Sequence, residues 1–344
     1  MPTRPSTSKG KSKPASAKSE TKSAATKAAV KKPRAASKSS KRRPAIHLIG
    51  FPMDLGADRR GVDMGPSALR IADIEGKLKA LGYKVEDHGD IDVREPEVLK
   101  ILDPRLKYLP EITDSCERLA RRVRTSLRGG DFPIVLGGDH SMAIGTIAGV
   151  AGYCRDQGKR LGVIWVDAHS DINTSMTSPS GNIHGMPVAA AIGIGAPELA
   201  RVGGDYQKLD PRNIVMIGLR SVDAGERAVI RETGIRAYTM TDIDRLGMHN
   251  VINESLDYLA ENVDHIHVSF DLDSVDPSIA MGVGTPVPGG LTYREAHLVM
   301  ETIAERGALG SLEVAEVNPI LDTLNNSALF AAELVASAMG KRIL

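Results

Sequence analysis

The chain has 344 residues, of which 42% are hydrophobic and 25% are charged, and its formal net charge is +1. These values are typical of a soluble globular protein, and no apolar run reaches the 18 residues that a membrane-spanning helix needs. The two cysteines, Cys116 and Cys154, form neither a disulfide framework nor a C-x-x-C zinc motif, which favours a reducing, cytoplasmic location.

The small net charge conceals two segments of opposite sign. Residues 1–44 contain 14 Lys and Arg residues and one acidic residue, Glu20, which gives +13, whereas the remaining chain carries −12. The first segment is rich in Lys, Ser, Ala and Pro, so it buries too little apolar surface to offset the entropy of ordering. We therefore predict a disordered basic tail that is neither a secretion signal nor a transit peptide. Weak binding of the tail to nucleic acid or another polyanion stays open.

From residue 45 onward, short apolar runs alternate with amphipathic stretches. Eight runs are typical of β-strands: Ala45–Phe51, Lys84–Asp87, Pro133–Leu136, Gly162–Val166, Asn213–Gly218, Arg236–Tyr238, His265–Phe270 and Ser311–Val317. Helical spacing of apolar residues is clearest in Ile112–Leu127, Val251–Ala260 and Tyr293–Ile303. Continuously apolar strands that alternate with helices indicate a parallel sheet covered on both faces. We predict one α/β/α domain that spans residues 45–344.

Good metal ligands follow three of these strands. They lie in Gly137-Gly-Asp-His140, in Asp167-Ala-His-Ser-Asp171 and in Asp271-Leu-Asp273. In open α/β sheets, ligands gather outside the carboxyl ends of the strands, where several loops converge. A single Asp at such a place is often a helix cap or a turn residue. Together, however, the set predicts one oxygen-rich metal centre, with six candidate ligands: His140, Asp167, His169, Asp171, Asp271 and Asp273.

Other polar residues near these motifs do not match a ligand position. Asp139 and Ser141 are expected to support the centre, and Asp276 before Pro277 is expected to form a turn. Ordinary core or surface roles are expected for the remaining histidines outside the motifs, namely His47, His88, His249, His265, His267 and His297.

The three motifs resemble a known family. Gly137-Gly-Asp-His-Ser141, Asp167-Ala-His-Ser-Asp171 and Ser269-Phe-Asp-Leu-Asp-Ser-Val-Asp-Pro277 are similar, in order and spacing, to the signatures of the ureohydrolases, which include arginases and agmatinases. The resemblance covers roughly residues 45–344. It implies an eight-stranded, mainly parallel α/β/α sandwich that assembles as a homotrimer or homohexamer. It also implies that each chain binds two Mn²⁺ ions and uses them to hydrolyse a guanidino group to urea. Carboxylate-rich ligation suits Mn²⁺ better than the thiolate or three-His sets that are typical of zinc.

The resemblance also implies a role for each ligand. His140 and Asp171 hold one ion, His169 and Asp273 hold the other, and Asp167 and Asp271 bridge both. Two such ions, about 3.5–4 Å apart, lower the pKa of a bridging water and aim the resulting hydroxide at the guanidinium carbon. Asp171 would in addition accept a hydrogen bond from that hydroxide and steady the tetrahedral intermediate.

The segment Asn173–His184 resembles the loop that distinguishes arginases from agmatinases. By this resemblance, Asn173 and Ser180 contact the substrate carboxylate directly, and Ser178 contacts it through water. Neutral donors of this kind match a carboxylate without burying another charge.

Further residues complete the implied site. Asp223 aligns with the residue that contacts the substrate α-ammonium, and Glu226 assists it through water. His184 resembles the proton shuttle of the family, and imidazole is well suited to proton transfer near neutral pH. Glu316 resembles the carboxylate that pins the guanidinium over the metals, and Thr285 supports this pocket. The sequence therefore predicts hydrolysis of L-arginine to L-ornithine and urea.

Three alternatives are open from the sequence. An agmatinase or guanidinobutyrase would leave Asp223 unpaired, or Asn173 and Ser180 idle, because its substrate lacks one of the two α-groups. A zinc deacetylase-like hydrolase binds its ion with one His and two Asp, so the presence of six candidate ligands argues against this alternative. A nucleic-acid-tethered or scaffolding protein would depend on residues 1–44, and a salt-dependent mobility shift that is lost with the tail would support that role.

Overall fold

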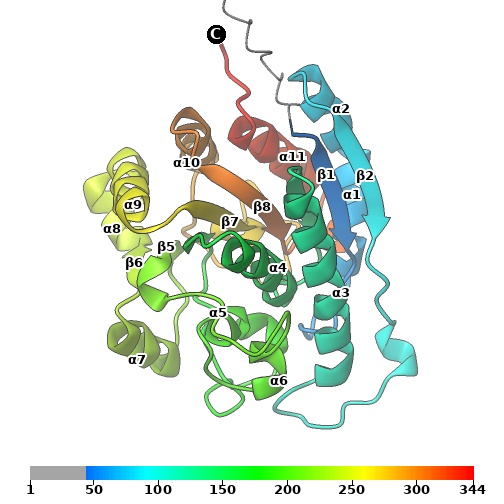
Figure 1. Ribbon diagram of the computed structural model, residues 1–344. Coiled ribbons are helices and arrows are strands. Elements are labelled where there is room, and N and C mark those ends of the chain that lie inside the picture. Colours follow the sequence, from blue (N-terminus) through cyan, green and yellow to red (C-terminus); the bar gives the residue numbers. More distant parts are fainter. Residues whose placement is uncertain (1–43) are drawn as a thin grey trace, which may run out of the picture. The chain divides into compact units, whose positions relative to one another are not determined.

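A computed structural model describes residues 44–344 of the protein, so the tail predicted for residues 1–44 lies outside the described residues apart from Pro44. The described chain contains eight strands: β1 (Ile46–Phe51), β2 (Val85–Asp90), β3 (Phe132–Gly137), β4 (Leu161–Val166), β5 (Ile214–Leu219), β6 (Arg236–Thr239), β7 (His265–Asp271) and β8 (Leu309–Ala315). They form one sheet in the order β2-β1-β3-β8-β7-β4-β5-β6 (Figure 1). Every neighbouring pair is parallel.

Helices connect the strands. The α-helices of the described residues are α1 (Gly65–Ile71), α2 (Ile74–Ala80), α3 (Leu109–Arg128), α4 (Met142–Asp156), α5 (Pro187–Ala191), α6 (Pro197–Ala200), α7 (Ala224–Thr233), α8 (Met240–Leu246), α9 (Met248–Asn262), α10 (Tyr293–Glu305) and α11 (Asn326–Ala338). Six short 3₁₀ helices accompany them: η1 (Val62–Met64), η2 (Pro96–Val98), η3 (Ile183–Gly185), η4 (Pro211–Asn213), η5 (Leu272–Ser274) and η6 (Pro319–Leu321). In residues 44–344, no helix combines the length and the apolar character that crossing a membrane requires.

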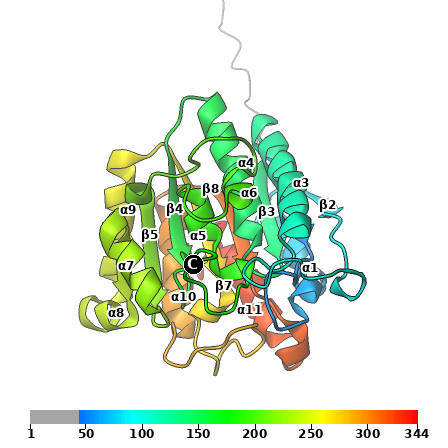
Figure 2. The same cartoon turned by 90° about the horizontal axis from the view of Figure 1, so that it is seen from below.

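Side-chain alternation along the strands creates two hydrophobic cores. In β1, Ile46 and Leu48 pack into one core with α1, α2 and α8–α11, while Ile49 and Phe51 pack into the other with α3–α6. Figures 1 and 2 show helices on both faces of the sheet. Since successive side chains of a strand point to opposite faces, both faces need such a cover. The predicted three-layer α/β/α fold is confirmed, and the sheet is parallel throughout.

The strand order brings the predicted motifs together. The four central strands are β3, β8, β7 and β4, and all three ligand motifs follow strands of this group. The remaining member of the group, β8, is followed directly by Glu316. In a parallel sheet the carboxyl ends of neighbouring strands share one edge, so these segments converge on one place.

Candidate metal centre and substrate site

One imidazole lies at the middle of the converging segments. Nδ1 of His140 is 3.1 Å from Asp167 Oδ2, 3.2 Å from Asp171 Oδ2 and 2.9 Å from Asp271 Oδ2. All four side chains are buried. Three of them, His140, Asp167 and Asp271, place their ligand atoms close enough together to hold one metal ion.

A second group of candidate ligands adjoins the first. Nδ1 of His169 is 3.4 Å from Asp167 Oδ1 and 3.1 Å from Asp273 Oδ2, and these three residues form the second set that is able to hold an ion. Asp167 directs one carboxylate oxygen to each histidine and therefore belongs to both groups. The bridging role that the family resemblance implies for Asp167 stays a prediction.

Neighbouring side chains orient the candidate ligands. His140 Nε2 is 2.8 Å from Ser269 Oγ, and Trp165 stacks on the His140 ring at 4.1 Å and donates its Nε1–H to Asp167 Oδ2 at 2.9 Å. The buried Nδ1 of His140 faces the carboxylate oxygens of three candidate ligands. Hydrogen bonding at the far ring nitrogen fixes the orientation of a metal-binding imidazole and leaves the near nitrogen for the ion.

The charges of the site favour a cation. Burial, together with Asp167, raises the pKa of Asp171 to about 6. Burial and the repulsion of Asp273 and Asp167 also raise the pKa of Asp271. Several carboxylates in one buried place are costly unless a counter-charge accompanies them. A set of carboxylate oxygens with two imidazoles therefore fits divalent metal ions.

Glu316 and His184 lie against the ligand cluster. Glu316 Oε1 accepts a hydrogen bond from His140 N–H at 3.1 Å and is 3.1 Å from His184 Nδ1. The Glu316 carboxylate raises the pKa of His184 to about 9, although burial alone would lower it. Glu316 Oε2 is buried without a hydrogen-bond partner in the described part of the chain. Glu316 and Asp171 also have left-handed backbones, with φ of 63° and 48°, a strain that is often found at functional sites.

Thr285, Asp139 and Ser141, which were predicted to support the site, form hydrogen bonds around it. Thr285 donates a hydrogen bond to Asp273 Oδ2 at 2.9 Å. Asp139 accepts hydrogen bonds from Gly56 N–H at 2.7 Å and from the Ser141 hydroxyl. Gly56 in turn accepts the backbone N–H of His184 at 3.0 Å. Asp139 therefore positions the segment on which His184 rests.

The predicted contacts for the α-ammonium surround the start of α7. Asp223 caps α7 by accepting from Glu226 N–H at 2.9 Å, and Glu226 Oε2 accepts from Asp223 N–H at 2.9 Å. Asn173 Nδ2 donates to the second carboxylate oxygen of Asp223 at 2.8 Å. Ser170, within the metal motif, donates to Glu226 Oε1 at 2.9 Å. The capping box thus joins the metal segment to the loop that follows it.

The two loop serines are not joined to this group. Ser178 Oγ accepts from Gly181 N–H at 3.0 Å, and Ser180 Oγ accepts from Asn182 N–H at 3.2 Å. Within the described residues, no hydrogen bond links either hydroxyl to Asn173 or Asp223. Ser178 and Ser180 lie in the same exposed loop, where they shape its turns.

Sequence reasoning missed Trp165 and Ser269 as supporting residues. Both stand two positions before a candidate ligand, Asp167 or Asp271, on a strand whose side chains alternate between faces. That spacing of two residues could have indicated that Trp165 and Ser269 lie on the same face of the sheet as these ligands. Gly284 was also missed, because its importance depends on a contact between distant segments: a Cβ there would come within 2.5 Å of Glu316 Oε2.

Comparison with known proteins identifies the family. The model of the Arginase family matches residues 44–340. The chain belongs to the Arginase family. The arginase of Bacillus caldovelox is 53% identical to this chain over 300 residues, which cover 87% of this chain and 99% of that protein. The arginase of Bacillus subtilis is 52% identical over 299 residues, with the same coverage. The solved native structure of the Bacillus caldovelox arginase superposes with a TM-score of 0.84 at 52% identity, covering 88% of this chain and all of that one.

Proposed function

We propose that the protein is an arginase, which hydrolyses L-arginine to L-ornithine and urea. The observation that carries the proposal is the gathering of two His and four Asp side chains beside Glu316 and His184, in a chain whose similar relatives are arginases. An α-amino acid substrate is favoured over agmatine because Asn173 and Asp223 stand together beside the metal motif.

We propose two Mn²⁺ ions per chain as the cofactor. His140, Asp167, Asp171 and Asp271 would hold one ion, and Asp167, His169, Asp271 and Asp273 would hold the other. When bound, the two ions supply a strong nucleophile at neutral pH and stabilise the negative charge that develops during hydrolysis.

Glu316 and His184 act on the guanidino end of the substrate in this proposal. The buried Oε2 of Glu316, which has no hydrogen-bond partner among residues 44–344, suits a guanidinium N–H donor, and such a charge-assisted bond orients the substrate carbon. His184 Nδ1 faces Glu316, so the other ring nitrogen serves proton transfer to the leaving amine of ornithine.

The α-groups of the substrate are assigned to the loop and α7. Asp223 binds the α-ammonium with help from Glu226, and Asn173 binds the α-carboxylate. Ser178 and Ser180 join this carboxylate contact, through water and directly, if their hydroxyls turn from the loop bonds that they make now. Thr285 supports the pocket through Asp273.

Assembly and location follow from the family resemblance and the cysteines. A homotrimer or homohexamer is proposed on the resemblance. A cytoplasmic location is supported by Cys116 and Cys154, which are both buried free thiols and need no oxidising compartment.

The deciding experiment measures urea release from L-arginine and from agmatine side by side, with Mn²⁺-loaded and with chelated enzyme. We expect rapid hydrolysis of L-arginine, little of agmatine, and loss of both after chelation that added Mn²⁺ reverses. A preference for agmatine would replace the arginase by the agmatinase alternative. Full activity at one metal ion or fewer per chain would reject the two-ion centre.

A further inference from the structure

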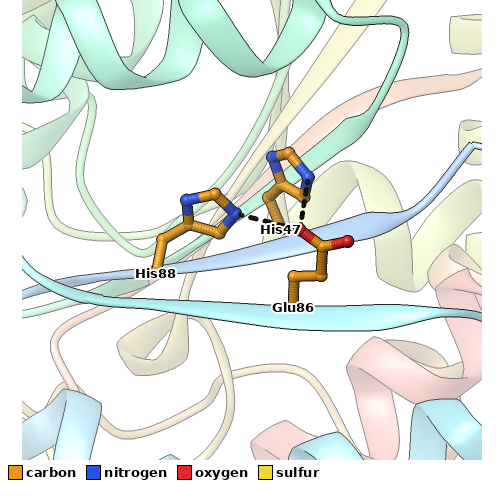
Figure 3. Close-up of side chains that lie close together, drawn as sticks. All are labelled: His47, Glu86 and His88. Atoms are coloured by element: carbon orange, nitrogen blue, oxygen red, sulfur yellow. Dashed lines mark ion pairs between the residues drawn. The ribbon is translucent and has the colours of Figure 1, made fainter.

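A second group of metal-binding side chains lies at the edge of the sheet, on strands that do not carry the site described above. His47 on β1 and Glu86 on β2 are direct partners in the parallel register. His88 stands two residues beyond Glu86 on the same strand and therefore on the same face. Figure 3 shows the three side chains converging between the two strands.

The distances suit ligands of a shared ion better than direct hydrogen bonds. Glu86 Oε2 is 3.7 Å from His47 Nε2 and 3.8 Å from His88 Nε2, beyond the usual hydrogen-bond range. Ligands of a tetrahedral ion with bonds of about 2.0–2.2 Å are separated by roughly 3.3–3.6 Å. One ligand atom from each of the three residues lies within 4.8 Å of the others. A closer approach of the three side chains would place them around one cation.

Each of the two histidines has Nε2 within 3.8 Å of Glu86 Oε2. His47 Nδ1 is 2.9 Å from Ser126 Oγ of α3, so Nε2 is the ring nitrogen that faces Glu86. The buried Nε2 of His88 has no hydrogen-bond partner among the described residues. The hydrogen bond between His47 Nδ1 and Ser126 Oγ is of the outer kind that usually supports a metal-binding imidazole.

Two charged side chains, Asp131 and Lys84, lie beside the group. Asp131, between α3 and β3, places Oδ2 at 3.5 Å from His47 Nε2, while its Oδ1 accepts the N–H of Ala45 at 2.9 Å. Lys84 pairs with Glu86 Oε1 and leaves Oε2 toward the histidines.

The group is also accessible from solvent. The side chains of His47, His88 and Glu86 are 12%, 30% and 39% exposed. An ion therefore has an entry path that does not pass through the catalytic pocket.

We propose that His47, Glu86 and His88 bind one Zn²⁺ ion at the sheet edge, with water as the fourth ligand. Two imidazoles and one carboxylate suit Zn²⁺, in contrast to the carboxylate-rich set at the strand ends. The ion ties the edge strand β2 to β1. It is a structural site, so hydrolysis does not depend on it.

The test counts metal ions in the full-length, tag-free enzyme. Enzyme loaded with Mn²⁺ is equilibrated with Zn²⁺, freed of unbound metal and measured by elemental analysis, for the parent and for a His47→Gln/His88→Gln variant. We expect the variant to bind one Zn²⁺ fewer per chain and to keep its Mn²⁺ content and its rate of urea release. His249→Gln, an exposed histidine of α9, is the matched control and should bind as much Zn²⁺ as the parent.

Thermal unfolding and two single variants test the same proposal if the double variant does not fold. Zn²⁺ should raise the Tm of the parent, because binding to the folded state alone stabilises it, and this shift should vanish in Glu86→Gln. Ser126→Ala should weaken Zn²⁺ affinity by about 10- to 100-fold through loss of the outer hydrogen bond. Equal Zn²⁺ content in the parent, the double variant and Glu86→Gln, with equal Tm shifts, would overturn the proposal. The group would then consist of polar contacts of the two histidines with Glu86 and Asp131 and would bind no ion.

Discussion

The two ends of the candidate site are built in different ways. The candidate metal ligands stand at the ends of central strands and are fixed by side chains such as Ser269 and Trp165. The residues assigned to the substrate α-groups stand in the exposed loop after Asn173 and at the start of α7. The contrast suggests that the sheet fixes the chemistry, whereas a loop and a helix cap fix the choice of substrate.

The sharpest test of this contrast removes a ligand shared by both metal groups. Asp167→Ala should lower kcat/KM for L-arginine by more than ~10³-fold and reduce bound Mn²⁺, because Asp167 faces both His140 and His169. Urea release and elemental analysis measure the two effects. Asp205→Ala, at an exposed aspartate, is the control and should leave both unchanged. A metal-replete, active Asp167→Ala enzyme would remove Asp167 from the centre.

The next prediction concerns the space around Glu316. Gly284→Ala should lower kcat/KM by about 10²-fold, because the new Cβ would lie 2.5 Å from Glu316 Oε2 and displace the carboxylate. Steady-state kinetics and Mn²⁺ analysis should show lost turnover with metal retained. Gly158→Ala strains a left-handed turn, with φ of 63°, and controls for a general loss of stability. Unchanged kinetics in Gly284→Ala would argue against a role of Glu316 in holding substrate.

At the other end of the site, two substitutions of Asp223 separate charge from helix capping. Asp223→Ala should raise KM by about 10- to 150-fold, the equivalent of losing ~1.5–3 kcal/mol of a charge-assisted contact, with a smaller change in kcat. It should also destabilise α7 by ~1 kcal/mol. Asp223→Asn should raise KM similarly while keeping most of the stability, because Asn still caps a helix. Kinetics and thermal unfolding distinguish the two effects, and a normal KM in both variants would exclude the ammonium contact.

The smallest effect is expected from the basic segment. Removal of residues 1–44 should leave kcat, KM and Mn²⁺ content unchanged, because no candidate site residue lies there, and should shift the net charge from +1 to −12. Binding to polyanions at low salt should fall accordingly. Kinetics, size-exclusion chromatography and heparin retention measure these outcomes. Loss of activity, or dissociation to a smaller species, would show that the segment belongs to the assembly.

The sequence predicted the strands well because buried parallel strands are continuously apolar. All eight predicted runs overlap observed strands, and the candidate ligands stand where the expected strands end. The helices α4 and α11 lack a clear polar face since they are buried on most sides, so apolar periodicity did not reveal them.

The sequence could not foresee contacts that only the sheet order creates. β2 was predicted to end at Asp87 but continues to Asp90, because pairing with β1 extends a strand whose side chains are mostly polar. That extension brings His88 beside His47, although both were expected to have ordinary roles. In the same way, no local pattern linked Gly284 to Glu316.

The capping box at α7 has a consequence for how the substrate preference of this chain is able to evolve. Asp223 both starts a helix and, in the proposed function, recognises the substrate ammonium. A substitution of Asp223 that suits a substrate without the α-ammonium would also remove the cap of α7. The variant with the new substrate preference would therefore be less stable. Asn173 touches Asp223 but caps no helix. Substitutions in the loop would therefore adapt the site to another guanidino compound at the lowest cost in stability, and a substitution of Asp223 would be expected last.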